Sequence, residues 1–526
     1  MAGKKMLISL LLVFGVFASG ETYRILGLFA FNGKSHFVMF ERLMKALASR
    51  GHQVDVASTY PLKKPYPNYT DIIVFEQPNG AWVNNLTFST LQNDFLVFRI
   101  APMVGHIGND ICKNMKNPDL QAIVKNPPKD PPYDLVILEI FAAHCFVAIG
   151  HKFGVPVIGV SSSDLYPWGN RLVANPENLA LVPTNLAPQL DLRFFWNRLT
   201  NVIDAWIDTA EFDYETTSIQ NEYIRKYVGP DVPGVRELEK TIALILVNTH
   251  ISINGIKPTT PALVEVGGLH IHDDGPDLPQ DLQQWLDESK DGVVYFSFGS
   301  MVRIETFPRD ILLAIYQSLR KIAPVRVLMK IPDPRDLPPG LPDNVLTRPW
   351  ISQLKVLNHK NVRAFVTHGG LMGTQEAIHY AVPMIGIPLF ADQHLNVDFY
   401  VEKKIAVKVD YKTLTVEKMD AALNAILYDP TYRETVKELS DRFLDRPLSA
   451  VDTAVFWVEY IIRNGGDSLR SPALDLAWWQ EALLDVFAVF LSAILVLIYL
   501  AYLLIRLLAR ILRRNRLKAN LSKKNR

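Results

Sequence analysis

The chain has 526 residues, of which 49% are hydrophobic and 21% are charged, and its formal net charge is +1. This composition lies in the globular range and excludes collagen-like and disordered chains. The length predicts two or more domains, and two cysteines are too few for a disulfide scaffold. A net charge near zero argues against a uniformly basic nucleic-acid-binding protein, so we expect no nucleic acid as a partner.

The first twenty residues have the layout of a secretory signal peptide. Lys4 and Lys5 precede an apolar run from Met6 to Phe17, and three small residues follow up to Gly20. Cleavage at that point leaves a chain that begins near Glu21. A signal anchor that stays in place is the alternative, but the apolar run is too short to span a bilayer.

A membrane span is predicted near the other end of the chain. Val486–Ile505 is twenty residues long without a charge, enough to cross the hydrocarbon core at about 1.5 Å rise per residue. Residues 506–526 hold nine basic residues and no acidic one, which places this tail in the cytosol and residues 21–485 in the lumen. Trp478 and Trp479 precede the span, where indole rings favour the membrane interface.

Two short motifs point to the secretory pathway. The chain ends in Lys523-Lys524-Asn525-Arg526, which resembles the dilysine retrieval signal of endoplasmic reticulum membrane proteins. A chance pair of lysines in a basic tail is the alternative. Two N-glycosylation sequons, which begin at Asn68 and Asn85, lie on the predicted lumenal side.

Apolar runs alternate with helical patterns in the first half of the lumenal part. The run Tyr23–Ala30 predicts a strand, apolar residues at helical spacing follow from Phe37 to Leu47, and Val54–Ala57 predicts a second strand. Such a βαβ unit requires a parallel sheet. Further strands are predicted at Leu135–Ile140 and Val155–Val160, with a helix around residues 143–152 between them.

The second half repeats this alternation and predicts a second doubly wound sheet. We therefore expect an α/β fold with two Rossmann-like domains, residues 21–269 and 293–465, joined by a linker at 270–292 with a short helix at 278–286. Ligands bind such sheets at the carboxyl ends of the strands. The strands predicted in this half are Val293–Phe298, Val325–Lys330, Val362–Thr367, Met384–Ile387 and Ile405–Val409.

The densest set of chemical motifs lies between Trp350 and Asn396. A strand ends at Thr367, three glycines follow, and a helix begins near Thr374. Backbone N–H groups and the positive end of the helix favour a phosphate at such a loop. The loop is not a Walker motif, because no Gly-Lys-Ser/Thr follows it.

This stretch closely resembles the signature of the UDP-glycosyltransferases, the membrane-bound sugar transferases of animals, and is most similar to the insect branch. Ser35-His36 in the first loop, the run Phe296–Ser300, the signal peptide and the C-terminal anchor agree with it. The resemblance implies a glycosyltransferase-B fold whose first domain binds the acceptor and whose second domain binds the UDP-sugar. It implies a UDP-sugar as co-substrate and no metal or other cofactor.

The family pattern implies roles for ten residues of the UDP-sugar site. Trp350 would stack on uracil with Gln353 beside it, and Glu376 would accept hydrogen bonds from the ribose. Asp392 and Gln393 would bind the sugar, with Gln393 typical of glucose donors. The residues that would hold the diphosphate are Ser300, His368, Gly370, Gly373 and Thr374.

His36 is the expected general base. It lies at a helix start, where the dipole disfavours protonation, and would take a proton from an acceptor hydroxyl that attacks the sugar with inversion. Relatives orient this histidine with an aspartate, and Glu139 occupies the corresponding place. Either Glu139 is the partner of His36 or the partner lies elsewhere, for instance at Asp164.

The expected reaction moves a hexose, glucose above all, to a hydroxyl of a small lipophilic acceptor. The alternative is a catalytically weak, membrane-anchored binding protein or a partner subunit in a homo- or hetero-oligomer of related transferases. Other residues are expected to have structural roles, or their state is left open. We expect structural roles for His144, His151 and His394. The two cysteines, Cys112 and Cys145, are either free or bridged. Three aromatic stretches either line an apolar pocket or pack in the core: Phe95–Phe98, Leu165–Trp168 and Phe194–Trp196.

Overall fold

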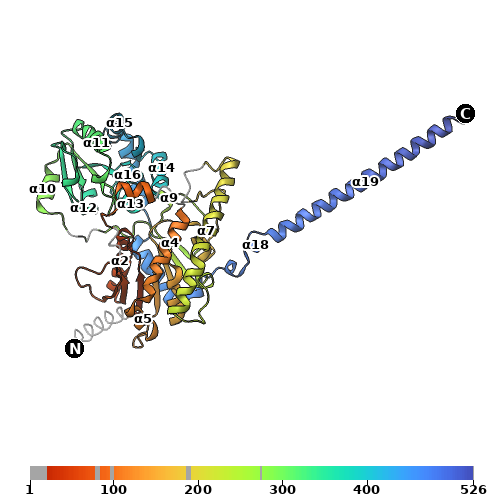
Figure 1. Ribbon diagram of the computed structural model, residues 1–526, viewed down its shortest axis with the longest axis horizontal. Helices are drawn as coiled ribbons and strands as arrows, with labels where there is room; N and C mark the ends of the chain where they lie inside the picture. Colours follow the sequence, from red (N-terminus) through yellow and green to blue (C-terminus); the bar gives the residue numbers. More distant parts are fainter. Residues whose placement is uncertain are drawn as a thin grey trace, which may run out of the picture. The chain divides into compact units, whose positions relative to one another are not determined.

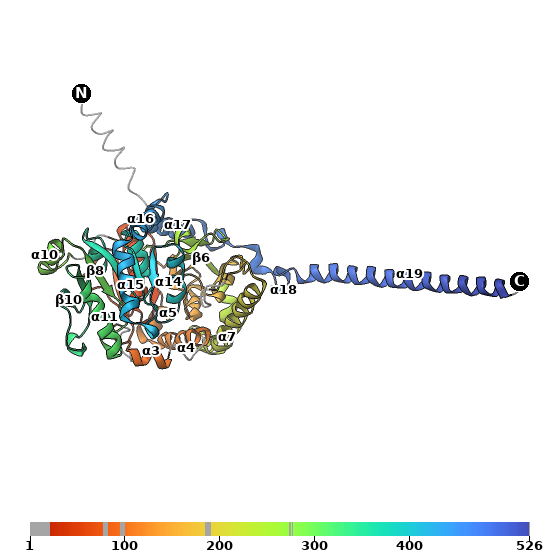
Figure 2. The same cartoon turned by 90° about the horizontal axis from the view of Figure 1, so that it is seen from above.

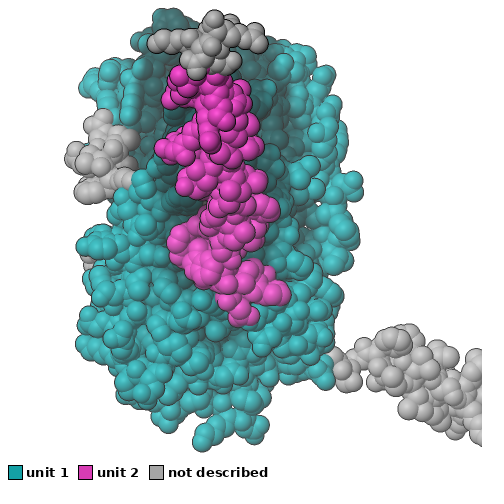
Figure 3. All heavy atoms as spheres, turned by 90° about the vertical axis from the view of Figure 1, so that its right-hand side faces the viewer, with its two compact units in different colours: residues 1–470 teal, residues 471–526 magenta. Residues whose placement is uncertain are grey.

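The computed structural model describes residues 21–76, 83–94, 100–184, 191–272, 275 and 277–524. The predicted signal peptide, the run Phe95–Phe98 and the last two residues of the dilysine motif lie outside these ranges. The chain divides into two compact units, residues 1–470 and residues 471–526, which Figure 3 colours separately. We describe each unit by itself.

The first sheet has seven parallel strands in the order β3-β2-β1-β4-β5-β6-β7. This order is that of a Rossmann fold, with its switch point between β1 and β4. The four strands predicted in this half are therefore confirmed, and three more extend the sheet at its edges. The strands are β1 Arg24–Phe29, β2 Gln53–Ser58, β3 Tyr69–Val74, β4 Leu135–Glu139, β5 Val157–Ser161, β6 Ile242–Val247 and β7 Leu263–Glu265.

The second sheet has six parallel strands in the order β10-β9-β8-β11-β12-β13, again a doubly wound arrangement. Its switch point lies between β8 and β11. All five predicted strands are confirmed, and β10 is an added edge strand. The strands are β8 Val293–Ser297, β9 Arg326–Lys330, β10 Val345–Arg348, β11 Val362–Thr367, β12 Met384–Gly386 and β13 Ala406–Lys408.

Helices cover both faces of each sheet (Figure 1). Helix α2 (Lys34–Ser49) forms as predicted, because apolar residues that recur every three or four positions, among them Phe37, Phe40 and Leu47, face the core. The first sheet carries α2 on one face and α5, α6 and α8 on the other. The other helices of this half are α3 Phe88–Asp94, α4 Ile100–Cys112, α5 Pro118–Lys125, α6 Val147–Phe153, α7 Phe195–Tyr227, α8 Val235–Glu239 and α9 Ile251–Asn254.

The helix predicted around residues 143–152 consists of a 3₁₀ turn, η2 (His144–Phe146), followed by α6. The predicted linker helix is present as α10. In the second half the helices are α10 Gln280–Glu288, α11 Arg309–Lys321, α12 Gln353–Leu357, α13 Leu371–His379, α14 Gln393–Glu402, α15 Val416–Tyr428, α16 Pro430–Leu444 and α17 Ala450–Asn464. Further 3₁₀ turns are η1 Lys113–Lys116, η3 Pro167–Val173, η4 Ile304–Thr306, η5 Pro334–Asp336, η6 Tyr411–Thr413, η7 Gly466–Leu469 and η8 Pro472–Asp475.

Helix α17 returns to the first sheet after the chain has completed the second. Ala454, Val458 and Ile461 are buried in the same apolar cluster as residues of α2, β1 and β6. The predicted range 293–465 groups this helix with the second sheet, whereas the structure packs it on the first. The domain boundaries themselves stay predictions.

The unit of residues 471–526 contains α18 (Trp478–Glu481) and α19 (Leu484–Lys524). Helix α19 is continuous from the predicted span into the basic tail. Among the described residues it is the one helix that is long and apolar enough to cross a membrane. A membrane-anchored chain is consistent with this helix, and the span boundaries at 486–505 stay predictions.

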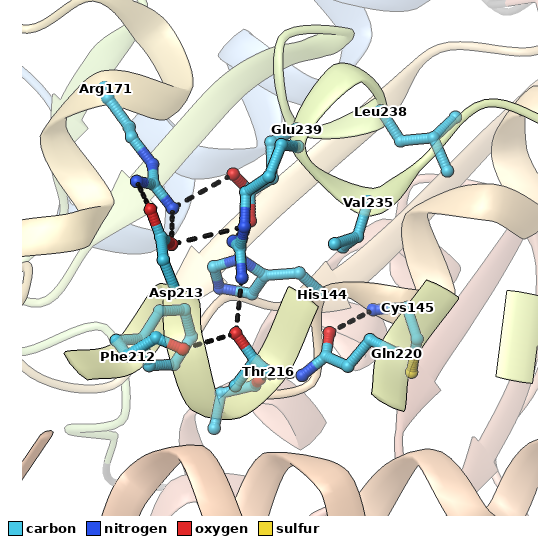
Figure 4. Close-up of polar contacts among 12 residues, drawn as sticks. His144, Cys145, Arg171, Phe212, Asp213, Thr216, Gln220, Val235, Leu238 and Glu239 are labelled. Atoms are coloured by element: carbon cyan, nitrogen blue, oxygen red, sulfur yellow. Dashed lines mark hydrogen bonds and ion pairs between the residues drawn. The ribbon is translucent and has the colours of Figure 1, made fainter. Parts of the chain in front are cut away.

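Cys112 and Cys145, left open above, form a disulfide that ties the end of α4 to η2. Beside it, a buried polar cluster attaches the long helix α7 to the first sheet (Figure 4). The side chain of Gln220 on α7 accepts a hydrogen bond from the Cys145 N–H at 3.0 Å and donates one to the Ala142 carbonyl at 2.9 Å. These bonds fix the position of α7 relative to the end of β4.

Glu239 lies at the centre of this cluster. Its carboxylate contacts His144 Nδ1 at 2.6 Å and Arg171 at 3.3 Å, and it accepts a hydrogen bond from Arg236. Burial raises the pKa of Glu239, but the hydrogen bond from His144 and the two guanidinium charges outweigh it, so the pKa is lowered. His144 is thus a buried structural residue, as predicted.

We expect Glu239→Gln to lower the free energy of unfolding by about 3 kcal/mol or more. The substitution leaves the guanidinium groups of Arg171 and Arg236 with the carboxylate of Asp213 alone. Urea unfolding of the full chain in detergent, followed by tryptophan fluorescence, measures this change. Glu237→Gln on the same helix is the control, since the Glu237 side chain is 69% exposed. Equal stability of the two variants would contradict the prediction.

Candidate active site

A cavity of about 360 Å³ lies where the carboxyl ends of strands from both sheets meet. In each sheet it opens at the switch point, where doubly wound folds bind ligands. The residues predicted for the site that line it are His36, Ser300, Trp350, Gln353, His368, Gly370, Gly373, Glu376, Asp392 and Gln393.

The first sheet contributes His36 and Glu139. His36 lies in the first turn of α2, after β1, and Glu139 is the last residue of β4. His36 Nδ1 is 2.6 Å from Glu139 Oε1. A proton on Nδ1 donated to the buried carboxylate leaves Nε2 as a hydrogen-bond acceptor.

Two aromatic rings, which also contact each other, pack against the imidazole of His36. Phe31 and Phe141 lie 4.7 Å and 5.3 Å from its centroid, both in edge-to-face geometry. Asp164, the alternative partner of His36, instead accepts a hydrogen bond from Lys257 Nζ at 2.6 Å. Glu139 is therefore the carboxylate that the structure places against His36.

Apolar residues form the wall of the cavity beside His36. Tyr166 lines it and stacks on the buried Trp168, so this part of the predicted aromatic run Leu165–Trp168 reaches the cavity. Phe194–Trp196 do not, because each of these side chains is at least 60% exposed. The other apolar lining residues on this side are Phe31, Val38, Ile100, Met103, Val104, Ile107 and Phe141.

The glycine-rich loop lies on the side of the second sheet. β11 ends at Thr367, Gly369 has a φ of +86°, and Gly370 caps α13. The first N–H groups of α13 have no partner within the helix and can bind an anion. The strand end and the glycine loop agree with the sequence prediction. The helix start does not, because Gly370 already caps α13, which begins at Leu371, three residues before Thr374, and includes Gly373.

His368 lies in this loop, partly buried. Burial and the charge on Lys330 lower its pKa to about 4, so the imidazole is neutral at pH 7. A Cβ atom at Gly299 or Gly370 would lie 2.9 Å or 2.8 Å from the ring, which explains why glycine occupies both positions. His368 can therefore offer a neutral hydrogen bond, but not a charge.

Trp350, Gln353 and Glu376 lie together at another part of the cavity. The indole of Trp350 is 57% exposed, as a stacking surface must be. Gln353 Nε2 donates to Glu376 Oε2 at 2.6 Å, and Gln353 Oε1 accepts from Tyr295 at 3.2 Å. Glu376 is also 3.3 Å from His270 Nε2.

Two predicted site residues, Glu139 and Thr374, do not line the cavity. Thr374 is fully buried, and its hydroxyl bonds to Tyr400 at 2.9 Å and to the Leu371 carbonyl. Asp392 accepts from Asn396 at 2.8 Å, and burial raises its pKa. The side-chain oxygen of Gln393 accepts from the Leu389 N–H at 2.9 Å.

Lys330 was not predicted as a site residue. It ends β9, its side chain is buried, and its ammonium lies 5.5 Å from the centre of the Trp350 ring. Burial lowers its pKa to about 8, so it stays charged at pH 7. A lysine that directly follows the apolar run Val327–Met329 at the carboxyl end of a strand is the sequence signal that would have found it.

The described residues contain no group of three or more His, Cys, Asp or Glu side chains suited to a metal ion. The expectation that no metal takes part stays a prediction.

The family described as UDP-glucoronosyl and UDP-glucosyl transferase has a model that matches residues 136–518 of the chain. The chain belongs to this family. UDP-glucosyltransferase 2 of Dactylopius coccus is 34% identical over 474 residues, or 88% of each chain. UDP-glucuronosyltransferase 2C1 of Oryctolagus cuniculus is 28% identical over 486 residues, or 89% of this chain and 95% of the relative.

Solved structures agree on the fold of this UDP-glycosyltransferase. The calicheamicin glycosyltransferase superposes with a TM-score of 0.54 at 17% identity, covering 85% of this chain and 100% of that one. The glycosyltransferase VinC in complex with DTDP gives 0.53, also at 17% identity. The expected glycosyltransferase-B fold and the assignment as a glycosyltransferase that uses a UDP-sugar are confirmed.

The affinity for the donor should depend on the charge of Lys330. We expect the dissociation constant of UDP-glucose to rise as the pH increases through about 8, because Lys330 loses its charge there while His368 is already neutral. Isothermal titration calorimetry of the full chain in detergent, from about pH 6.5 to about pH 9, measures this dependence. Lys330→Arg should flatten it, because arginine stays charged. A constant affinity in the unsubstituted chain would contradict the prediction.

Proposed function

We propose that this transferase moves glucose from UDP-glucose to a hydroxyl of a small lipophilic acceptor, with inversion at the sugar C1. The observation that carries this proposal is His36, which lines the same cavity as the glycine-rich loop of α13 and is held from behind by Glu139. A base and an anion site in one cavity are what a group transfer between a hydroxyl and a nucleoside diphosphate requires.

In the proposed step, His36 Nε2 takes the proton from the acceptor hydroxyl. The acceptor oxygen forms a bond to C1 as the bond from C1 to the UDP oxygen breaks, and the electron pair leaves with UDP. Glu139 holds the proton on Nδ1 and stabilises the imidazolium that forms. Lys330, His368 and the N-terminus of α13 would stabilise the charge that develops on UDP.

Two observations support glucose as the donor sugar, and a third supports a lipophilic acceptor. Asp392 and Gln393 line the cavity, and Gln393 resembles the glucose-type residue of the family. The named relative of Dactylopius coccus is a UDP-glucosyltransferase. The apolar wall around Tyr166 and α4 supports a lipophilic acceptor, because it offers few hydrogen-bonding groups.

We further propose an endoplasmic reticulum membrane protein of type I with a lumenal catalytic part. The basic tail after the predicted span, residues 506–526, and the dilysine motif support this orientation and location. The sequons at Asn68 and Asn85 would then be open to glycosylation. A small-molecule conjugation role, as in detoxification or hormone and pigment conjugation, follows from the acceptor class.

We expect His36→Ala to lower kcat by about a hundredfold or more, because it removes the base. Glu139→Gln should lower kcat by about tenfold or more, because it removes the charge that stabilises the imidazolium. Single-turnover kinetics with UDP-glucose measure both effects. The affinity for UDP should not change, since neither side chain lies at the glycine-rich loop. Full turnover by His36→Ala would exclude the proposed base.

A screen of phenols and other lipophilic alcohols with radiolabelled UDP-glucose tests the reaction itself. We expect labelled glucoside product, and unlabelled UDP-glucose should compete better than UDP-glucuronic acid or UDP-galactose. Binding of UDP-glucose without product from any acceptor would instead favour the catalytically weak binding protein or partner subunit.

A further inference from the structure

Residues 83–94, which we name the crossing segment, belong to the first half of the chain but pack on the second sheet. They lie in the sequence between β3 and α4, both elements of the first half. Leu86 forms a parallel β-bridge with Val302, and its N–H donates to the Met301 carbonyl at 3.0 Å. The Arg303 N–H donates back to the Leu86 carbonyl at 3.0 Å.

Apolar contacts hold the crossing segment in place. Leu86 and Leu91 are buried in the core cluster formed by β8, β9 and α11, and Figure 2 shows α3 next to α11. Phe88 packs against Phe307 at 4.8 Å and Tyr411 at 5.9 Å between ring centroids. Burial of three apolar side chains makes this a stable attachment rather than a loose contact.

Asn84 connects the crossing segment to two residues that line the cavity, Lys330 and Ser300. Its side-chain oxygen accepts a hydrogen bond from Lys330 Nζ at 2.6 Å, and its N–H donates to the Ser300 carbonyl at 2.8 Å. Lys330 Nζ also donates to the Gly299 carbonyl at 2.7 Å. One residue of the first half therefore contacts both the cation and the serine loop of the cavity.

An ammonium has three N–H donors. The Asn84 and Gly299 oxygens accept two of them and leave the third for a ligand in the cavity. We propose that Asn84 is a positioning residue for the UDP-sugar, which aims the Lys330 ammonium and holds Ser300 where the diphosphate binds. This inference rests on the proposed function, because it assumes that the diphosphate lies beside Lys330.

The charge on Lys330 depends on its neighbours. Glu305 favours the charged form, whereas burial favours the neutral form, and His368 on the neighbouring loop is neutral near pH 7. The Trp350 ring covers the ammonium. Asn84 stabilises the charged form through its oxygen, so a change at Asn84 should move the pH at which UDP-sugar binding is lost.

Titration calorimetry with UDP-glucose on the full chain tests the proposal. Asn84→Ala should raise the dissociation constant about tenfold or more, the loss expected for a hydrogen bond to a charged group. At saturating donor its kcat should also fall, because Lys330 would stabilise the charge that develops on UDP as the bond to C1 breaks. The pH above which binding fails should shift down in Asn84→Ala and up in Asn84→Asp, because a carboxylate holds the proton on Lys330.

Ser89→Ala is the matched control. Ser89 is an exposed residue of the crossing segment outside the sequon at Asn85, and its substitution should leave the affinity and its pH dependence unchanged. Thermal melting shows whether each variant is folded. A folded Asn84→Ala with unchanged affinity, or with weaker binding but an unmoved pH dependence, overturns the role of Asn84. Absence of UDP-glucose binding in the unsubstituted chain overturns the proposed function as well.

Discussion

The parallel direction of all strands in each sheet determines where chemistry can occur in this chain. The carboxyl ends of parallel strands lie at one edge, so residues that follow neighbouring strands meet there even when the chain separates them. His36 and Glu139 are 103 residues apart but pair, because β1 and β4 are neighbours. The same rule brings the loops after β8 and β11, with Ser300 and His368, to one cavity.

Burial gives His368 and Lys330, the two basic groups beside the proposed diphosphate position, different charge states at pH 7. It lowers the pKa of both, but His368 becomes neutral while Lys330 stays charged at pH 7. A ligand there meets one full charge and several oriented N–H groups. Because the net charge of the chain is only +1, selectivity for an anion must come from this local arrangement and not from the overall field.

Strands and glycine loops could be predicted from the sequence, because they depend on local periodicity and backbone conformation. The end of β11 at Thr367 is an example. The partner of His36 could not be decided from the sequence, which left Glu139 and Asp164 open, because the choice depends on the tertiary pairing of β1 with β4. Thr374 could not be placed, because the helical phase that turns its hydroxyl toward Tyr400 depends on tertiary packing. Asn84 could not be found either, since no local pattern shows that its segment leaves the sheet of its own half.

The return of α17 to the first sheet bears on the order of events during synthesis. Residues 450–464 cover an apolar face made by β1, β6 and α2, so that face stays open to water until almost the whole unit has left the ribosome. Folding of the first half as an independent nascent domain is therefore incomplete. Chaperones of the compartment into which the chain emerges would meet this uncovered face, and truncation before residue 450 should yield a chain that aggregates.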